Sequence, residues 1–336
     1  MRLSVARRTV ALREAHRAAH GKLTERELFD VVLEGADGVA GRGEAAPLES
    51  YDGVSGDLVA AALAAHARAI AALDDDATGP QLLEACRQAA DLPQAVAAVD
   101  MALWDRGGRR AGQPVTALLT DEAAAEVEVN ATIGALDRGR AADAAAEAAR
   151  AGFRCVKVKV GLGDDAGRVA AVRALAGPEM ALRLDANGAW DVEDAVRHIE
   201  ALAPAGLELV EEPVHGIEAL RAVRERVPVR IAMDETAAEH GALASAAADA
   251  VCLKVGRCGG ISATLAAAAL VRAMGGEVYL ASALDGPVGI AAALHCAAAL
   301  NVELPCGLAT LGQLELDDPF PVVAGRIAVP TAPGLL

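Results

Sequence analysis

The 336-residue sequence is poor in aromatic side chains, which make up 2% of it as two Trp, two Tyr and three Phe. It is nevertheless 54% hydrophobic, because Ala, Val and Leu supply most of the apolar side chains. Small helix formers and β-branched residues pack well as helices against strands, so the composition favours an α/β fold. The length is sufficient for one large or two moderate domains with a substantial buried core.

The sequence also lacks any C-x-x-C pair, and several of its six cysteines fall inside apolar runs. A reduced thiol packs there as a small hydrophobe, so we interpret the cysteines as free thiols in a reducing compartment. Residues 1–13 contain no apolar h-region, and no stretch is long and apolar enough to predict a membrane span. We therefore expect a cytoplasmic protein with no membrane partner.

Positive charge is in the minority, since 31 Lys and Arg stand against 47 Asp and Glu for a formal net charge of −16. A field of this sign and the lack of a basic stripe disfavour nucleic acid as a partner. We interpret the acidic surface as a contribution to solubility. A small molecule is the expected partner, and the sequence predicts no particular oligomeric state.

The first third of the chain predicts a small α+β unit. Its alternating apolar patterns favour antiparallel strands at residues 5–12, 28–33 and 39–44. A polar, basic loop with His16 and His20 separates the first two strands, and it is either solvated surface or substrate-facing. Helices are expected over residues 53–73, 81–90 and 92–106. The breaker-rich segment 107–114 follows, so we expect residues 1–115 to form a capping domain.

Beyond this segment, short apolar strands alternate with helical patterns at nearly regular intervals. The predicted strands end near residues 133, 159, 185, 211, 234, 254 and 282, with a weaker eighth strand at 301–304. This spacing fits a strand plus a crossover helix, which predicts a parallel sheet with right-handed connections. Seven or eight such units close a barrel. We expect a modified (β/α)7β TIM-type barrel over residues 116–312, and residues 313–336 to return to the cap.

Several of these strands end in a charged side chain, and the carboxyl ends of barrel strands form one rim. Asp185, Glu211 and Asp234 end three successive strands, so their carboxylates should converge and repel one another. Each acid alone could be a helix cap. Three together favour a hard divalent cation, Mg²⁺ with Mn²⁺ as a substitute, because such ions prefer carboxylate oxygens.

Lysines flank the three acids along the chain. Lys157 and Lys159 point to the same side of one strand, while valines point to the other, and Lys254 ends the strand after the acids. A lysine acts as a general base when its pKa falls from about 10.4 toward 7 or 8. The second ammonium, the metal charge and burial should all lower it. The pattern predicts removal of the α-proton of a carboxylate, with the enediolate stabilised by the metal.

The ordered motifs Lys-x-Lys, Asp-x-Asn, Glu-Glu-Pro, Asp-Glu and Lys resemble the enolase superfamily over nearly the whole chain, and the lysines mark its muconate-lactonizing branch. Lysine bases and Mg²⁺-stabilised enediolates are the established chemistry of that superfamily. The resemblance implies metal ligands at Asp185, Glu211 and Asp234, and an acid/base pair in Lys159 and Lys254. It further implies supporting roles for Lys157, Asn187 and Glu235. His295 falls in a predicted helix and is expected to be core.

The stretch after the seventh strand separates reactions within the branch. Dipeptide epimerases carry Asp-x-Asp there, whereas this chain has Ala283 in the first position and keeps Asp285. The stretch Ser282 to Asp285, with residues 20–27, 306–310 and 325–335, is similar to o-succinylbenzoate synthases. These are dehydratases of menaquinone biosynthesis that often have Gln where Glu212 stands and Glu where Asp285 stands. Ser282 and Asp285 are thus expected to contact or support the substrate.

Four other functions stay open from the sequence. A dipeptide epimerase, an N-acylamino acid racemase and a muconate-type cycloisomerase would use the same metal and lysines. A barrel that binds a ligand without catalysis would keep the fold, since fold alone does not fix activity.

Overall fold

The computed structural model describes residues 1–18, 21–74 and 76–336. Its N-terminal part contains a three-stranded antiparallel sheet in the order β1 (Arg2–Ala18), β2 (Gly21–Glu34) and β3 (Ala40–Ala45). The predicted loop between the first two strands is wrong, because β1 and β2 stay paired as far as Ala18 and Gly21. Alternation predicts a strand only where one face is buried, and Arg13 and Glu14 are exposed. His20 lies outside the described residues.

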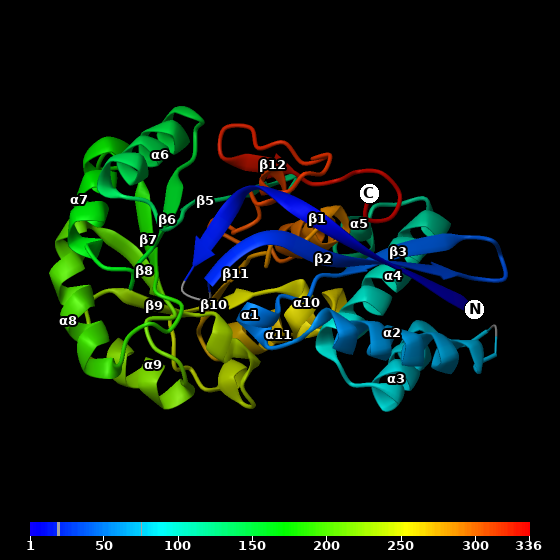
Figure 1. The fold of residues 1–336 in the computed structure, drawn as a ribbon. Helices are drawn as coiled ribbons and strands as arrows, with labels where there is room; N and C mark the ends of the chain where they lie inside the picture. Colours follow the sequence, from blue (N-terminus) through cyan, green and yellow to red (C-terminus); the bar gives the residue numbers. More distant parts are fainter. Residues whose placement is uncertain (19–20, 75) are drawn as a thin grey trace.

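Helices cover one side of this sheet, in the right half of Figure 1. They are α1 (Glu49–Asp52), α2 (Gly56–Ala71), α3 (Gly79–Ala89), α4 (Pro93–Ala111) and α5 (Val115–Leu119). The three predicted helices correspond to α2, α3 and α4. However, α4 continues through Gly107 and Gly108 instead of ending before them. A Cβ atom on Gly108 would lie 2.7 Å from the Cα atom of Gly334, so this glycine permits close packing of the C-terminal segment.

The second part is a parallel sheet that curls into a barrel, with its strands neighbouring one another in chain order. Its strands are β5 (Ala131–Ile133), β6 (Cys155–Lys159), β7 (Ala181–Asp185), β8 (Leu207–Glu211), β9 (Arg230–Met233), β10 (Ala250–Leu253) and β11 (Glu277–Leu280). They end within a few residues of the predicted positions. The side chains of Val156 and Val158 are fully buried, whereas Lys157 and Lys159 line a pocket, as the alternation predicts.

Helices pack on the outside of the barrel (Figure 1). They are α6 (Arg138–Arg150), α7 (Asp165–Ala176), α8 (Val192–Leu202), α9 (Ile217–Arg224), α10 (Val255–Cys258), α11 (Ile261–Ala273) and α12 (Pro287–Ala299). Between β9 and β10, two short 3₁₀ turns at Glu235–Ala238 and Ala242–Ala244 take the place of an α-helix. His295 is buried within α12, in agreement with its predicted place in the core.

The barrel is closed by residues other than the predicted eighth strand at 301–304, so that prediction is wrong. Cys306 pairs in parallel with Val129, and Gly307 pairs in parallel with Ala281. Pro305 has no amide hydrogen to give to a ladder, so pairing begins only after it. The predicted fold class, a TIM-type barrel with an α+β cap, is confirmed.

The C-terminal segment lies against both parts of the chain. Its strand β12 (Arg326–Ala328) pairs antiparallel with β4 (Glu126–Glu128), which precedes the barrel. The Leu335 amide donates to Asp105 Oδ1 on α4 at 2.7 Å. One hydrophobic cluster fills the cap, and a larger one fills the barrel and includes Val10 and Met101 of the cap. We therefore propose the division 1–115, 116–312 and 313–336. Within the described residues, no helix is long and apolar enough to cross a membrane.

Candidate active site

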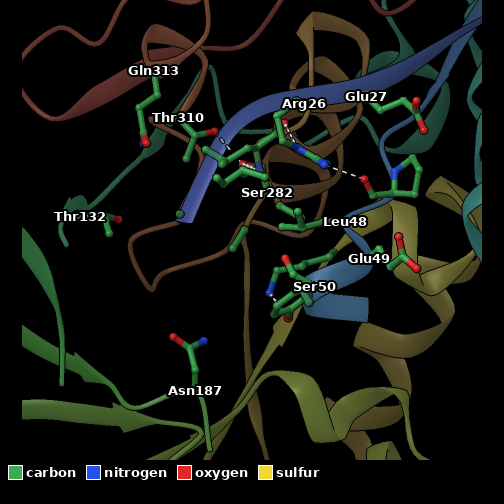
Figure 2. A pocket seen from close by; sticks show the side chains of 18 of the residues that line it. Arg26, Glu27, Leu48, Glu49, Ser50, Thr132, Asn187, Ser282, Thr310 and Gln313 are labelled. Atoms are coloured by element: carbon green, nitrogen blue, oxygen red, sulfur yellow. Dashed lines mark hydrogen bonds between the residues drawn. The ribbon is translucent and has the colours of Figure 1, made fainter. Parts of the chain in front are cut away.

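A pocket of about 480 Å³ lies at the carboxyl ends of the barrel strands, between the barrel and the cap. The cap contributes residues from β2 and from the segment leading into α1, including Arg26, Pro47 and Tyr51. In Figure 2, Arg26 and Ser50 come from the cap, whereas Asn187 and Thr132 come from the barrel. Its barrel wall includes seven of the predicted site residues, namely Lys157, Lys159, Asp185, Asn187, Asp234, Lys254 and Ser282.

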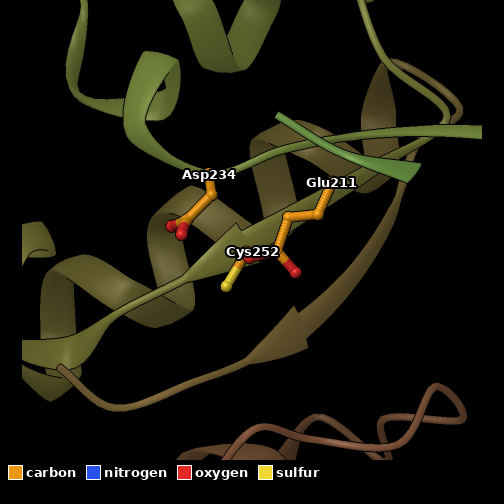
Figure 3. Close-up of side chains that lie close together, drawn as sticks. All are labelled: Glu211, Asp234 and Cys252. Atoms are coloured by element: carbon orange, nitrogen blue, oxygen red, sulfur yellow. The ribbon is translucent and has the colours of Figure 1, made fainter. Parts of the chain in front are cut away.

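The three predicted metal ligands are buried at neighbouring strand ends. Asp185 ends β7, Glu211 ends β8, and Asp234 follows β9. One carboxylate oxygen each from Glu211 and Asp234, together with Cys252 Sγ, lie within 4.8 Å of one another (Figure 3). The ammonium of Lys157 connects Glu211 to the third acid, because its Nζ lies 3.0 Å from Glu211 Oε1 and 3.1 Å from Asp185 Oδ2.

The other two lysines lie on opposite sides of this group, since β7, β8 and β9 separate their strands. Lys159 Nζ donates to Asp185 Oδ2 at 2.6 Å and to Asn187 Oδ1 at 2.7 Å. Lys254 forms an ion pair with Asp234. A substrate carbon held between Lys159 and Lys254 could transfer a proton to the Nζ atom of either lysine, once that nitrogen is neutral.

Burial and charge act against each other in this cluster. Burial raises the pKa of Glu211 to about 7, although Lys157 opposes the shift. Burial likewise disfavours the ionised form of Asp185, but the two lysines beside it hold the pKa of that carboxyl well below its usual range. Burial lowers the pKa of Lys157, but Glu211 and Asp185 outweigh it and raise the pKa overall. This direction differs from the lowered lysine pKa expected from the sequence, because the carboxylates face the lysines directly.

The residues present fit a hard divalent cation. Three buried carboxylates at adjacent strand ends offer the oxygen ligands that Mg²⁺ prefers. Such an ion would partly neutralise the carboxylates that now raise the pKa values of Lys157 and Lys254. Burial keeps the pKa of the Cys252 thiol well above its usual value, and a neutral thiol is a poor ligand for Mg²⁺. The assignment of Asp185, Glu211 and Asp234 as metal ligands therefore stays our prediction.

Buried side chains fix the loops that carry these groups. Glu212 has a positive φ of 41°, and its carboxylate accepts hydrogen bonds from the amides of Asp234 (2.7 Å) and Thr236 (3.0 Å). It thus joins the end of β8 to the loop after β9. Asn187 Nδ2 donates to Glu235 Oε1 at 2.8 Å, which joins that same loop to the end of β7. Asn187 and Glu235 therefore lie where a supporting role was expected.

The sequence analysis did not identify the two tyrosines of the chain, yet both hydrogen-bond to predicted metal ligands. The Tyr51 hydroxyl, on α1 of the cap, donates to Asp234 Oδ1 at 2.8 Å and accepts from Lys254 Nζ at 2.8 Å. Arg257 Nη1 also donates to this hydroxyl, at 3.0 Å. The Tyr279 hydroxyl, on β11, donates to Glu211 Oε2 at 2.7 Å. The scarcity of tyrosine in the sequence is the signal that could have drawn attention to them.

In the loop after β11, the side chains that line the pocket differ in part from those expected. Ser282 and Ala283 line the pocket, and Ser282 Oγ lies 2.6 Å from Thr310 Oγ1. Asp285 is not among the described residues that line the pocket. Burial raises the pKa of Asp285 to about 6, and Arg26 opposes this shift. At this loop, the described residues that line the pocket are therefore Ser282, Ala283 and Leu284, none of which is an acid.

Comparison with known proteins identifies two family models in the chain. Residues 2–120 match the mandelate racemase/muconate lactonizing enzyme N-terminal domain, and residues 140–335 match the enolase C-terminal domain-like model. An o-succinylbenzoate synthase of Thermobifida fusca is 42% identical over 60% of this chain and 66% of that enzyme. A hydrophobic dipeptide epimerase of Enterococcus faecalis is 33% identical over 76% of this chain and 74% of that enzyme.

A solved structure is similar to this chain over almost the full length of both proteins. It is a dipeptide epimerase from Enterococcus faecalis V583 complexed with Mg and the dipeptide L-Leu-L-Tyr. The TM-score is 0.89, at 28% sequence identity, over 99% of this chain and 98% of that one.

Proposed function

This chain belongs to the mandelate racemase/muconate lactonizing enzyme family of the enolase superfamily, and we propose that it is an o-succinylbenzoate synthase. In that reaction, 2-succinyl-6-hydroxy-2,4-cyclohexadiene-1-carboxylate loses the proton α to its carboxylate and its ring hydroxyl, which leave as water. The products are o-succinylbenzoate and one water molecule, so atoms balance and no oxidant is consumed. The superfamily as a whole supports an enzyme that acts on a carboxylate, and the particular substrate is our inference.

The two lysines divide the work of the proposed reaction. Bound at Asp185, Glu211 and Asp234, Mg²⁺ would supply the positive charge that an enediolate requires. Either Lys159 or Lys254 takes the α-proton at its Nζ atom, and the other lysine stabilises the charge that develops. Asn187 orients Lys159 through its 2.7 Å hydrogen bond, and Tyr51 orients Lys254 through its hydroxyl.

One observation carries the choice of a dehydratase over an epimerase. The pocket is lined by Ala283, and Asp285 is not among its lining residues. A free α-ammonium entering a buried pocket needs an anionic partner, and leaving it unpaired costs about 1 to 3 kcal/mol. Among the described residues of this loop that line the pocket, none is an acid, whereas a cyclohexadiene ring carries no ammonium. The 42% identity to an o-succinylbenzoate synthase also supports this choice.

A second candidate is the epimerisation of dipeptides, which one feature favours. Three acids, Glu25, Glu27 and Glu49, line the cap side of the pocket, and Glu25 and Glu49 are exposed. Their charges would attract a cationic substrate toward the mouth. Glu27 is already paired with Arg7 at 2.6 Å, so its charge is partly compensated.

Steady-state kinetics on the native protein with Mg²⁺ distinguishes the two functions. We expect kcat/KM for dehydration of the cyclohexadiene carboxylate to exceed kcat/KM for epimerisation of hydrophobic dipeptides such as L-Leu-L-Tyr. A faster epimerisation would contradict the dehydratase and leave the family, the fold and the proposed metal site intact. Dehydratase activity would place the protein in menaquinone biosynthesis, in the cytoplasm.

A further inference from the structure

The loop from Ser282 to Gly286, which follows β11, has an unfavourable backbone conformation. Leu284 has a φ of 61°, in the left-handed region that residues with a Cβ atom rarely adopt. Such a conformation persists only where the surrounding structure holds it. Because Ser282, Ala283 and Leu284 all line the pocket, whatever holds this loop also shapes the wall that faces the substrate.

Arg26, a buried cation of the cap, contacts this loop directly. Its side chain donates to three backbone carbonyls, those of Leu284 (Nε, 3.3 Å), Pro47 (Nη1, 2.6 Å) and Ala46 (Nη2, 2.8 Å). The guanidinium therefore joins β2, the segment leading to α1 and the loop after β11. All three segments contribute to the pocket lining. The dashed line from Arg26 in Figure 2 marks one of these bonds.

Glu44, a buried carboxyl group on β3 of the cap, contacts the far end of the same loop. Its Oε1 atom accepts from the amides of Gly286 (2.7 Å) and Gly289 (3.3 Å), at the N-terminus of α12. A Cβ atom on Gly286 would lie 2.3 Å from Glu44 Oε2, so a glycine is required for this approach. Arg8 Nη2 lies 3.9 Å from the same Oε2 atom.

We propose that Arg26 and Glu44 are positioning residues that hold the loop 282–286 from the cap and thereby determine which substrate the pocket accepts. This inference rests on the proposed function, because it concerns the specificity of the same site. The cap then acts on specificity through hydrogen bonds of two buried side chains to the backbone of this loop, in addition to the cap side chains that line the pocket. Burial lowers the pKa of the Arg26 guanidinium, and the acids Asp285, Asp52, Glu44 and Glu27 oppose this shift only in part.

The first experiment measures the loop itself, independently of any substrate. Amide hydrogen exchange of residues 282–289 is compared between the native protein, Arg26→Met and Arg26→Lys. Methionine removes all three hydrogen bonds, and lysine keeps the charge but cannot span three carbonyls. We expect exchange to accelerate about tenfold or more in Arg26→Met and less in Arg26→Lys. Unchanged exchange in a folded variant would overturn the proposal.

Arg106→Met is the matched control. Arg106 is also a buried arginine of the cap, and it donates to the Val39 carbonyl at 3.0 Å and to Asp37 at 2.6 Å. It is not among the described pocket-lining residues. This variant should lower the melting temperature without changing exchange at 282–289. If exchange at 282–289 accelerated equally in Arg26→Met and Arg106→Met, the cause would be a general destabilisation of the protein. That result would also overturn the proposal.

The second experiment measures specificity with the same variants. The ratio of kcat/KM for the cyclohexadiene carboxylate to kcat/KM for L-Leu-L-Tyr should change about ten- to a hundredfold in Arg26→Met, mainly through KM. Mg²⁺ binding measured by calorimetry should stay native. A native ratio in Arg26→Met would contradict the inference. Absence of turnover of either substrate by the native protein would instead contradict the proposed function, and hydrogen exchange would still decide the inference.

Discussion

The barrel and the cap place their side chains around one pocket in different ways. The barrel presents charged side chains at the ends of consecutive strands, where Asp185, Glu211 and the lysines pair with one another. The cap instead contacts the pocket through Tyr51 and Arg26, which come from segments far away in the sequence. The difference agrees with our proposal that the barrel residues carry the chemistry and that the cap positions the groups around them.

The largest expected effect comes from the barrel. We predict that Asp185→Asn, Glu211→Gln and Asp234→Asn each abolish turnover and leave the fold intact, because three ligands to one ion leave little redundancy. Circular dichroism and calorimetric titration with Mg²⁺ check the fold and the binding separately. Glu239→Gln serves as the control, because it alters an exposed acid five residues after Asp234. This variant should keep native activity. Native Mg²⁺ affinity in all three variants would contradict the ligand assignment.

The lysines should give the next largest effect. Lys159→Ala is expected to lower kcat by about 10²- to 10⁴-fold, the range for loss of a positioned general base, with KM changed less. Lys254→Ala should differ from it in a dehydration, because only one of the two lysines moves the proton. Rapid-mixing and steady-state kinetics measure both. Identical profiles for the two variants, with deuterium exchange at both faces of a substrate in D₂O, would favour a racemase instead.

The two tyrosines provide a matched pair across the division between barrel and cap. Tyr279→Phe removes the hydrogen bond to Glu211 from within the barrel, so Mg²⁺ affinity should fall about tenfold, as expected when a partner of a metal ligand is lost. Tyr51→Phe removes bonds to both Asp234 and Lys254, so kcat should fall as well. Calorimetry and kinetics on both variants test this. If Tyr51→Phe changed neither quantity, the cap would not position the site.

A substitution at the pocket wall should shift activity from dehydration toward the epimerisation of dipeptides. Ala283→Asp introduces an acid where a methyl group now lines the pocket, so a dipeptide ammonium gains a partner. We expect kcat/KM for dipeptides to rise by about tenfold and kcat/KM for dehydration to fall. Ala283→Asn, of similar size without the charge, is the control. An equal rise in both variants would mean that size and not charge is responsible.

The smallest expected effect is on the pH dependence of stability. Burial raises the pKa of Glu44 to about 8, with Asp285 adding to the shift, from an ordinary value of 4.5. Between these two pH values the folded protein holds a proton that the unfolded chain has lost. The free energy of unfolding should therefore fall as the pH rises, by at most about 1.4 kcal/mol per pH unit. Glu44→Gln should reduce the dependence of the free energy of unfolding on pH, as measured by urea titrations at several pH values. If this dependence stayed unchanged, groups other than Glu44 would be its cause.

Much of the barrel could be predicted because its signals are local. Strand ends such as Lys159 and Asp185 follow short apolar runs, and parallel strands bring such ends to one rim. The eighth strand was misplaced because Cys306 and Gly307 form only isolated bridges directly after Pro305, so no regular strand marks their position. The strand β1 was predicted too short, since Arg13 and Glu14 are exposed and no buried face imposes alternation at these two residues.

The contacts that the cap makes could not be predicted in the same way. The hydrogen bonds of Tyr51 to Asp234 and of Arg26 to Leu284 join residues that lie 183 and 258 positions apart. Propensity and periodicity describe neighbours along the chain, so they do not report such contacts. Which residues of the loop after β11 line the pocket depends on its backbone conformation, including the positive φ of Leu284, which the sequence pattern does not specify.

Metal dependence is the most direct test of the claim that the rim carboxylates act through a divalent cation. The native protein is treated with EDTA, freed of the chelator, and titrated with Mg²⁺ while dehydration of the cyclohexadiene carboxylate is followed by absorbance. We predict no turnover in the metal-free protein and a saturable recovery with Mg²⁺, and with Mn²⁺ as a substitute. Full turnover by the metal-free protein would contradict the role of Asp185, Glu211 and Asp234.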